Sequence, residues 1–216
     1  ISCVPDTTSK INFIENDTIF DKNGVQFVIN PNDEFGLTRA MWIKEKDNSS
    51  IDVINVGLQD TEPILRKTLA IGADKAIRIN SDPKDSFQVA KLISDYVSKN
   101  NYDLIIAGRE SIDFNGNMVP GIISELLGMN FITNCVGLDI IGNKITAKRE
   151  IEGGTETLSF DLPASFPWLS ITRIFNSVSV LPKVLFTTNL AFSAILSATL
   201  SDSFCARLRT SFAVFA

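Results

Sequence analysis

Apolar and polar positions recur with two different periods along this chain, and the periods predict its strands and helices. Short apolar runs at 51–56, 76–80 and 102–107 are typical of buried strands. Between them, 62–71 has a helical composition, and 85–99 places apolar residues three or four positions apart, as on one face of a helix. This order of elements predicts parallel strands joined by right-handed crossovers, at adjacent positions of one sheet.

The N-terminal part predicts a β-ribbon followed by a helix. Polar and apolar residues alternate from Lys10 to Ile29, and Asn23-Gly24 separates the runs KINFI and VQFVI as a hairpin signal. After Asn30-Pro31, Asn32 or Asp33 is expected to cap a helix that ends near Lys46. The residues expected on the buried sides of this helix and of the helix at 85–99 are Phe35, Ala40, Met41 and Ile43, and Phe87, Ala90, Ile93 and Val97.

After Gly128 the pattern changes to three strand-like runs, FITNCVGLDI, KITAKREI and TETLSFDL. The pairs Gly142-Asn143 and Gly153-Gly154 separate these runs and are typical of tight turns. The chain is therefore expected to continue as an antiparallel β extension of the parallel core.

The composition changes again near Ala164. From there to Ala216 the chain has no Gly and no Glu, but nine Ser and seven of its fifteen Phe. The uncharged run from Val184 to Leu200 is short for a membrane span of about 20 residues and contains Thr, Asn and Ser throughout, so we expect no membrane insertion. The tail is either out of frame or foreign, or a divergent native terminus.

Charge and composition exclude several classes of function. The net charge of −5, without a basic cluster, disfavours nucleic acid as a partner. The chain has no His, which removes His-based acid–base chemistry and most zinc sites. Cys3, Cys135 and Cys205 are odd in number and far apart, which favours a reducing compartment and a cytoplasmic location. The first residue is Ile1, not Met, and we expect a few native residues before it.

The candidate site is the stretch from Tyr102 to Leu127, an apolar strand, a polar loop and an amphipathic segment. Ligands bind beyond the carboxyl ends of such strands, where a helix N-terminus offers unpaired N–H groups. Gly116 and Gly121 have the spacing of a phosphate loop, but no Lys-Ser/Thr follows, so this is not a Walker A motif. Glu110 and Asp113 would repel phosphate, so the amides of 117–119 are the expected contacts. The alternative is an ordinary strand-to-helix connection.

Four segments together resemble a known family. They are Asn30-Pro31-Asn32-Asp33-Glu34, LRKTLAIGADKAIRI (65–79), DLIIAGRESID (103–113) and REIEGGTETL (149–158). Over residues 1 to about 163, the chain closely resembles the beta subunit of electron transfer flavoprotein, the FixA-like family. The Arg-Glu-x-Glu-Gly-Gly-x-Glu stretch followed by Pro163 is the most specific of these matches.

The resemblance implies an α/β fold with an adenine-nucleotide-hydrolase-like, Rossmann-like parallel core. It also implies a heterodimer with an alpha subunit that carries most of the FAD site, and a bound AMP or, in bifurcating members, a second FAD. The expected function is to shuttle electrons from acyl-CoA or other dehydrogenases to an acceptor. The chain would have no catalytic residue of its own, because the flavin carries the chemistry.

The family's nucleotide contacts fall on three parts of this sequence. Carried over by position, they are Asn30, Pro31, Asn32, Asp33, Val56, Gly108, Arg109, Glu110, Ser111, Ile112, Asp113, Phe114, Asn115, Gly116, Asn117, Met118 and Val119. Where many members have Gln-Thr-Gly, this chain has Met118-Val119-Pro120, which removes a hydroxyl and one N–H donor. A further family contact lies before Ile1.

The resemblance divides the chain into an α/β domain at 1–163 and an atypical tail at 164–216. Family sequence after Pro163 docks redox partners and wraps the alpha subunit, and from Ser165 nothing here matches it. Two other functions therefore stay open. The chain is either a stand-alone adenine-nucleotide-binding domain of the same fold, or a chain made non-productive by its C-terminus.

Overall fold

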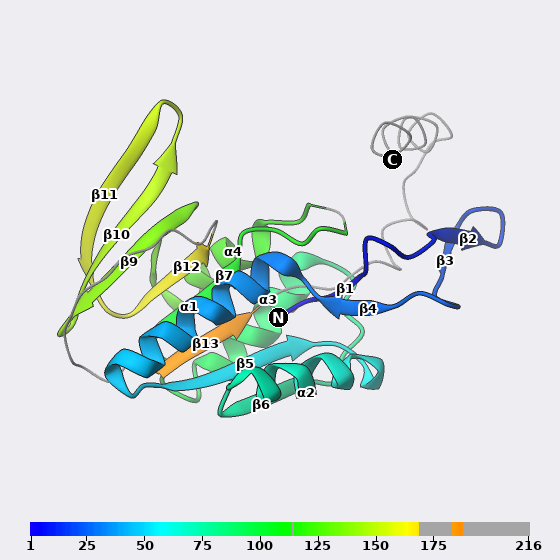
Figure 1. Ribbon diagram of the computed structural model, residues 1–216, viewed down its shortest axis with the longest axis horizontal. Helices are drawn as coiled ribbons and strands as arrows, with labels where there is room; N and C mark the ends of the chain where they lie inside the picture. Colours follow the sequence, from blue (N-terminus) through cyan, green and yellow to red (C-terminus); the bar gives the residue numbers. More distant parts are fainter. Residues whose placement is uncertain (114, 169–182, 188–216) are drawn as a thin grey trace.

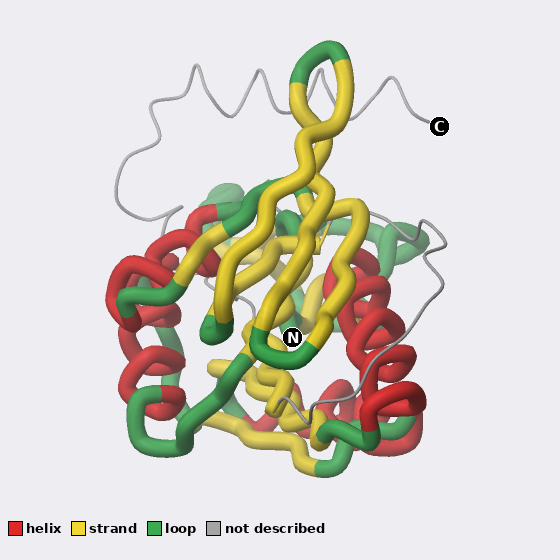
Figure 2. The backbone as a smooth tube through the Cα atoms, turned by 90° about the vertical axis from the view of Figure 1, so that its left-hand side faces the viewer, coloured by secondary structure: helices red, strands yellow, loops and turns green. Residues whose placement is uncertain are grey.

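A central β-sheet with helices on both faces forms the core of the molecule (Figure 1 and Figure 2). The computed structural model describes residues 1–113, 115–168 and 183–187. In these residues nine strands form one sheet, in the spatial order β11-β10-β9-β12-β7-β13-β5-β6, with β8 beside β12. The strands that run parallel are β5 (Ser50–Val56), β6 (Lys75–Ile79), β7 (Leu104–Gly108), β12 (Ala164–Trp168) and β13 (Lys183–Thr187), joined by β8 (Asn130–Phe131) at the side of β12.

The predicted alternation of strands and helices is confirmed. The helices are α1 (Pro31–Asp47), α2 (Glu62–Ile71), α3 (Ser86–Val97) and α4 (Met118–Leu127). Asp85 caps α3 with its side chain, which accepts a hydrogen bond from the backbone N–H of Gln88 at 2.7 Å. Gly72 and Gly128 end α2 and α4 with positive φ angles of 133° and 63°.

One part of the predicted topology is wrong. The strands β5 and β6 are neighbours as expected, but β13 lies between β7 and β5 and pairs parallel with both. The order of strands along the chain predicts that β5 and β7 are adjacent, whereas the position between them is filled by β13, which begins at Lys183, far beyond the end of β7 at Gly108. The segments β12 and β13 both come from the region that the composition had set apart as a tail.

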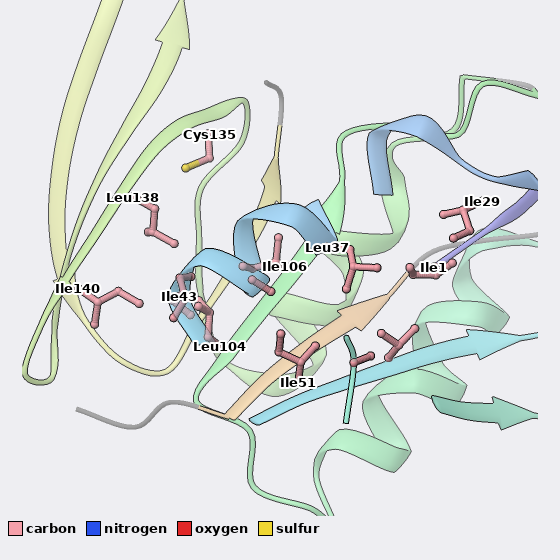
Figure 3. Packing of buried hydrophobic residues seen from close by; sticks show 14 of the residues in the cluster. Ile1, Ile29, Leu37, Ile43, Ile51, Leu104, Ile106, Cys135, Leu138 and Ile140 are labelled. Atoms are coloured by element: carbon pink, nitrogen blue, oxygen red, sulfur yellow. The ribbon is translucent and has the colours of Figure 1, made fainter. Parts of the chain in front are cut away.

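The sheet separates two apolar clusters, because alternate side chains of each strand point to opposite faces. Ile51 and Val53 of β5 pack with Leu104 and Ile106 of β7 in the cluster beneath α1 and α2 (Figure 3). The cluster on the other face combines Ile54 and Ile105 with apolar residues of α3 and α4. Both central strands are thus buried on both faces, as in other parallel sheets.

The amphipathic patterns predicted two side chains on the buried sides of their helices that are exposed in the structure. Phe35 of α1 and Phe87 of α3 are 38% and 58% exposed, whereas Leu37, Ile43, Val89 and Ile93 are buried. Phe35 is the fifth residue of α1 and Phe87 the second residue of α3, so both lie near the N-terminal ends of their helices. Helical spacing identified the period in these segments but assigned its first position incorrectly.

The antiparallel extension is confirmed. It consists of β9 (Cys135–Ile141), β10 (Lys144–Ile151) and β11 (Gly154–Asp161), which form a meander with turns at Gly142 and Gly153. Both glycines have positive φ angles, 62° and 83°, as such tight turns require. The β10–β11 hairpin projects away from the helices (Figure 1).

The predicted pairing of KINFI with VQFVI is wrong. Instead, β2 (Asn12–Ile14) pairs with β3 (Ile19–Asp21), and β4 (Phe27–Ile29) pairs with β1 (Cys3–Pro5). Three residues with positive φ, Glu15, Asn16 and Asp17, make the hairpin turn. Gly24, the expected hairpin position, connects β3 to β4, which belong to different sheets.

Candidate functional site

The loops that leave the parallel strands gather at one edge of the sheet. Because β5, β6 and β7 are parallel, their last residues Val56, Ile79 and Gly108 lie at the same carboxyl edge. The segment 30–33, which includes Asn30 after β4 and the first residues of α1, also reaches this edge, as its hydrogen bonds to Gly108 and Glu110 demonstrate. Ligands of open α/β sheets bind at such an edge.

The buried carboxylate of Asp33 holds this edge together. Its Oδ1 accepts a hydrogen bond from the backbone N–H of Gly108 at 2.8 Å. Its Oδ2 accepts hydrogen bonds from the backbone N–H and the hydroxyl of Ser2 at 2.9 and 2.8 Å, and from the Asn30 amide at 3.2 Å. A carboxylate that is 1% exposed is stable there because several donors surround it.

This role corrects the predicted helix cap. The helix α1 begins at Pro31, and its N-cap residue Asn30 makes no side-chain capping hydrogen bond. Asp33 lies inside the first turn, and its carboxylate reaches across to β7 instead of capping its own helix. Pro31 suits the first helical position because it has no N–H that would need a partner.

Asn30 and Asn32 fix the loop after β7. Their side-chain amides donate to the same acceptor, the carbonyl oxygen of Glu110, at 2.8 and 2.9 Å. The Asn30 Oδ1 accepts from the backbone N–H of Ile112 at 3.3 Å. The sequence predicts that the loops at 30–33 and 108–119 converge at one edge of the sheet, and residues 30–33 are in direct contact with the first part of the second loop, at 108–112.

Gly108 is where these segments approach most closely. A Cβ atom at this position would lie 2.4 Å from Asp33 Oδ1 and 2.9 Å from the Asp33 backbone nitrogen. No side chain fits at that distance, so the contact between β7 and α1 requires glycine here.

The rest of the loop folds back on itself before α4. The backbone N–H of Ser111 donates to the Gly116 carbonyl at 3.0 Å, and the N–H of Asn115 donates to the Ser111 carbonyl at 2.8 Å. Asn115 has a positive φ of 57°. Asn117 precedes α4, and its side chain makes no capping hydrogen bond, so it leaves the first-turn amides to other acceptors. Phe114 lies outside the described residues.

The charges of the loop are partly neutralised within it. Arg109 and Glu110 form an ion pair with each other, and both side chains are half-buried. Ser111 is 2% exposed, and its hydroxyl has no hydrogen-bond partner among the described residues. Met118, at the start of α4, is 62% exposed, whereas Val119 is buried.

Comparison with known proteins identifies the family that this sequence matches. The sequence model described as the electron transfer flavoprotein domain matches residues 17–166. The chain belongs to the electron transfer flavoprotein family. Its beta-subunit relatives include the electron transfer flavoprotein subunit beta of Bacillus subtilis (35% identical over 162 residues, 73% of this chain) and of Mycobacterium leprae (32% over 173 residues, 76% of this chain). The probable subunit beta of Schizosaccharomyces pombe is 33% identical over 172 residues, also 76% of this chain.

The match to these electron transfer flavoprotein subunits does not extend over their whole length. The aligned stretches span 62% of the Bacillus relative, 65% of the Mycobacterium relative and 68% of the Schizosaccharomyces relative. The family match ends at residue 166, close to the point where the composition of the chain changes.

Val56, the remaining position carried over from the electron transfer flavoprotein family, lies apart from the other two segments. It is buried at the end of β5, and β13 separates β5 from β7. The backbone N–H of Gly57, the next residue, donates to the Ile79 carbonyl at 3.1 Å, which ties this loop to β6. The edge of the sheet thus has two fixed parts, one around Gly108 and one around Gly57.

Sequence reasoning missed Ser2, which supplies two of the hydrogen bonds to Asp33. Nothing in the local pattern around Ser2 indicates a partner 31 residues away. Cys135 is buried in the core, and burial raises the pKa of its thiol to about 12, so the reactive thiolate is scarce at neutral pH.

Within the described residues, no group of three or more Cys, Asp or Glu side chains is arranged to hold a metal ion. No helix in this part of the chain is both long and apolar enough to cross a membrane. Of the uncharged run at 184–200, residues 184–187 belong to β13 and the others lie outside the described residues.

Proposed function

We propose that this chain acts as an electron transfer flavoprotein beta subunit and holds an adenine nucleotide at the carboxyl edge of its sheet. The observation that carries the proposal is the direct contact between 30–33 and 108–113, made by Asp33, Asn30 and Asn32. These are two of the three segments on which the family's nucleotide contacts fall. Their rigid connection would give a ligand a preformed edge to bind.

The predicted site residues divide into two roles. The side chains of Asn30 and Asp33 are buried and hydrogen-bonded to protein, so we propose that they position the loop instead of touching the nucleotide. Groups at the surface of the edge would make the contacts, namely the exposed or half-buried residues Ile112, Asp113, Asn115, Gly116, Asn117 and Met118.

The phosphate would bind at the N-terminus of α4. The first turn of α4, where the Asn117 side chain makes no capping hydrogen bond, would offer the amides of Met118 and Val119, whereas Pro120 has no N–H to donate. Glu110 is paired with Arg109, which reduces the repulsion that its carboxylate would exert on a phosphate. This arrangement fits a monophosphate such as AMP, with fewer donors than a Thr-Gly sequence at 119–120 would supply.

The flavin would reside mainly in a partner. FAD, when bound in the heterodimer, supplies the redox chemistry, and this chain would contribute the wall of its pocket and the nucleotide site. An alpha subunit is therefore the proposed partner, and acyl-CoA or other dehydrogenases are the proposed donors. A second FAD in place of AMP is the alternative ligand of the same edge.

Nucleotide binding and electron transfer are tested separately. Acid extraction of the purified chain, followed by chromatography, identifies any bound AMP or FAD, and calorimetric titration with AMP measures its affinity. Mixing the chain with a cognate alpha subunit and following flavin reduction by an acyl-CoA dehydrogenase then tests electron transfer. Binding of neither nucleotide would contradict the nucleotide site, and failure to form a heterodimer would contradict the beta-subunit role.

The measurement of flavin reduction also tests the region from Ala164 onward. The sequence predicts that this tail does not support normal electron transfer, because it replaces the sequence with which the family docks its partners. A full-length beta subunit of the family is the matched control. Equal rates of flavin reduction with the two chains would contradict the prediction about the tail while supporting the proposed function.

A further inference from the structure

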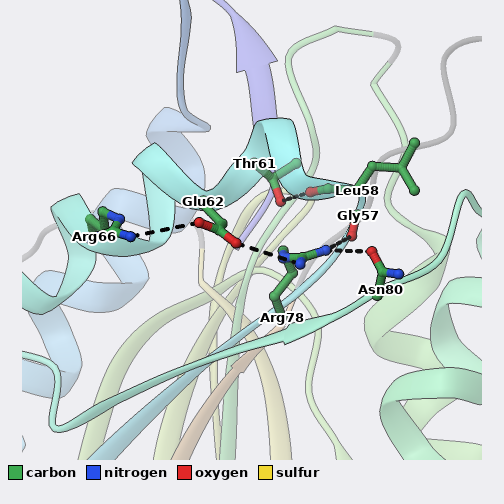
Figure 4. A network of polar contacts seen from close by, with 7 residues as sticks. All are labelled: Gly57, Leu58, Thr61, Glu62, Arg66, Arg78 and Asn80. Atoms are coloured by element: carbon green, nitrogen blue, oxygen red, sulfur yellow. Dashed lines mark hydrogen bonds and ion pairs between the residues drawn. The ribbon is translucent and has the colours of Figure 1, made fainter.

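A cluster of charged and polar groups covers the second part of the carboxyl edge, where β5 and β6 end (Figure 4). The chain turns at Gly57 into the short 3₁₀ helix η1 (Gln59–Thr61) and then into α2. This turn is tight, because a Cβ atom on Gly57 would lie 2.7 Å from the Thr61 methyl group. The Thr61 hydroxyl closes the turn by donating to the Leu58 carbonyl at 2.9 Å.

Arg78 joins three parts of this cluster. Its Nη1 donates to the Gly57 carbonyl at 3.2 Å and to Asn80 Oδ1 at 2.6 Å. Its Nη2 lies 3.6 Å from the carboxylate of Glu62, the first residue of α2. The Arg78 side chain is 21% exposed, so these contacts are partly shielded from water.

Arg66 lies in the same cluster but has a different environment. It lies 3.7 Å from the other oxygen of Glu62, and its side chain is 79% exposed. Figure 4 shows it on the far side of Glu62 from Gly57. The two arginines therefore carry the same charge, share one carboxylate, and differ in whether they contact the backbone of the loop.

We propose that Arg78 is a positioning residue, which holds the Gly57–Thr61 loop in the place that an adenine nucleotide requires beside Val56. The inference rests on the proposed function. The Gly57 N–H already donates to Ile79 on β6, and Arg78 fixes the carbonyl of the same residue, so both polar groups of its backbone are anchored to β6. A fixed loop loses no freedom when a ligand binds, which favours affinity.

A different role for Arg78 would be attraction of the ligand's phosphate by its charge. Arg66 separates these two roles, since its removal takes away the same charge from the same cluster and leaves the Gly57 carbonyl bonded. Attraction by charge predicts similar losses for the two arginines. Positioning predicts a loss for Arg78 alone.

The test compares Arg78→Met, Arg78→Lys and Arg66→Met with the unaltered chain by calorimetric titration with AMP and by amide hydrogen exchange. We expect Arg78→Met to weaken AMP binding about tenfold, which corresponds to the charge-assisted hydrogen bond to the Gly57 carbonyl, and to speed exchange in the peptide that covers 57–61. Arg78→Lys should recover part of both effects, because an ammonium group can still donate to the Gly57 carbonyl. Arg66→Met should alter neither.

The outcomes distinguish a failure of the proposed function from a failure of the positioning role of Arg78. If the unaltered chain binds no adenine nucleotide, the proposed function fails and any role of Arg78 toward a ligand fails with it. If the unaltered chain binds AMP but Arg78→Met binds it equally well, only the positioning role is overturned. Equal losses in Arg78→Met and Arg66→Met, with unchanged exchange at 57–61, would also overturn it and would favour attraction by charge.

Discussion

The carboxylate of Asp33 accepts a hydrogen bond from the backbone N–H of Gly108 at 2.8 Å, across 75 residues of sequence. This bond links the first turn of α1 to the end of β7, the two elements whose loops form the candidate site. Since Ser2 and Asn30 donate to the same carboxylate, Asp33 connects three separate segments.

Replacing Asp33 should therefore destabilise the fold as well as the site. Asp33→Ala leaves the buried donors of Gly108 and Ser2 without an acceptor, and we expect the free energy of unfolding to fall by about 3 kcal/mol or more. Chemical denaturation measures this change. The matched control is Glu34→Ala in the same turn, whose exposed ion pair with Lys67 at 3.5 Å should contribute less than about 1 kcal/mol. Equal effects of the two substitutions would contradict the role given to Asp33.

Gly108 should not tolerate even a methyl group. In Gly108→Ala the new Cβ would lie 2.4 Å from Asp33 Oδ1, so α1 and β7 must separate, and we expect a loss of stability of about 2 kcal/mol together with weaker AMP binding. Gly121→Ala is the control, because its Cβ would meet only the Phe131 ring at 3.5 Å. This second substitution lies in α4 and should be neutral or stabilising by up to about 1 kcal/mol. Thermal unfolding of both variants checks the prediction, and a Gly108→Ala variant as stable as Gly121→Ala would refute it.

The position of β13 predicts that the region after Ala164 contributes to the core. Proline at Leu185 removes a backbone N–H from a strand that pairs with β5 and β7 on its two sides, and we expect a loss of about 3 kcal/mol. Leu185→Val keeps the N–H and serves as the control. Should Leu185→Pro unfold at the same denaturant concentration as the unaltered chain, then 1–163 folds without β13, as the composition predicted.

The thiols of Cys3 and Cys135 should react very slowly in the folded protein. Burial raises the pKa of each to about 12, so at pH 8 the reactive thiolate is about a thousandfold scarcer than in an unfolded chain. The raised pKa also means that the folded state favours the neutral thiol, so this contribution to stability is lost as the pH rises above about 8.5. Alkylation at pH 8 with peptide mapping, in buffer and in urea, measures the difference. Comparable labelling of these two cysteines in both conditions would be inconsistent with their burial.

The sequence predicted the parallel core, its helices and the antiparallel extension, because apolar period and turn residues determine these elements locally. It also predicted that the loops at 30–33 and 108–119 converge, since the elements that they follow or precede end at one edge of the sheet. The hydrogen bonds of Ser2 and the position of β13 could not be predicted in this way. Each depends on a partner far away in sequence, and the composition after Ala164 does not indicate a strand of the core at β13. Local signals also failed to predict the hairpin of β2 and β3, because its turn contains no glycine. Glu15, Asn16 and Asp17 adopt positive φ angles there instead.

The most direct test of the proposed nucleotide site is photolabelling with 8-azido-AMP, followed by mass spectrometry of the labelled peptides. Excess AMP is added in a parallel sample to identify specific labelling. We predict AMP-protected labels in peptides that contain 30–33, 56–61 or 108–119, and a loss of labelling in Gly108→Ala. The absence of AMP-protected labelling, or protected labels only on the β10–β11 hairpin or the β2–β3 hairpin, would contradict a nucleotide site at the carboxyl edge of the sheet.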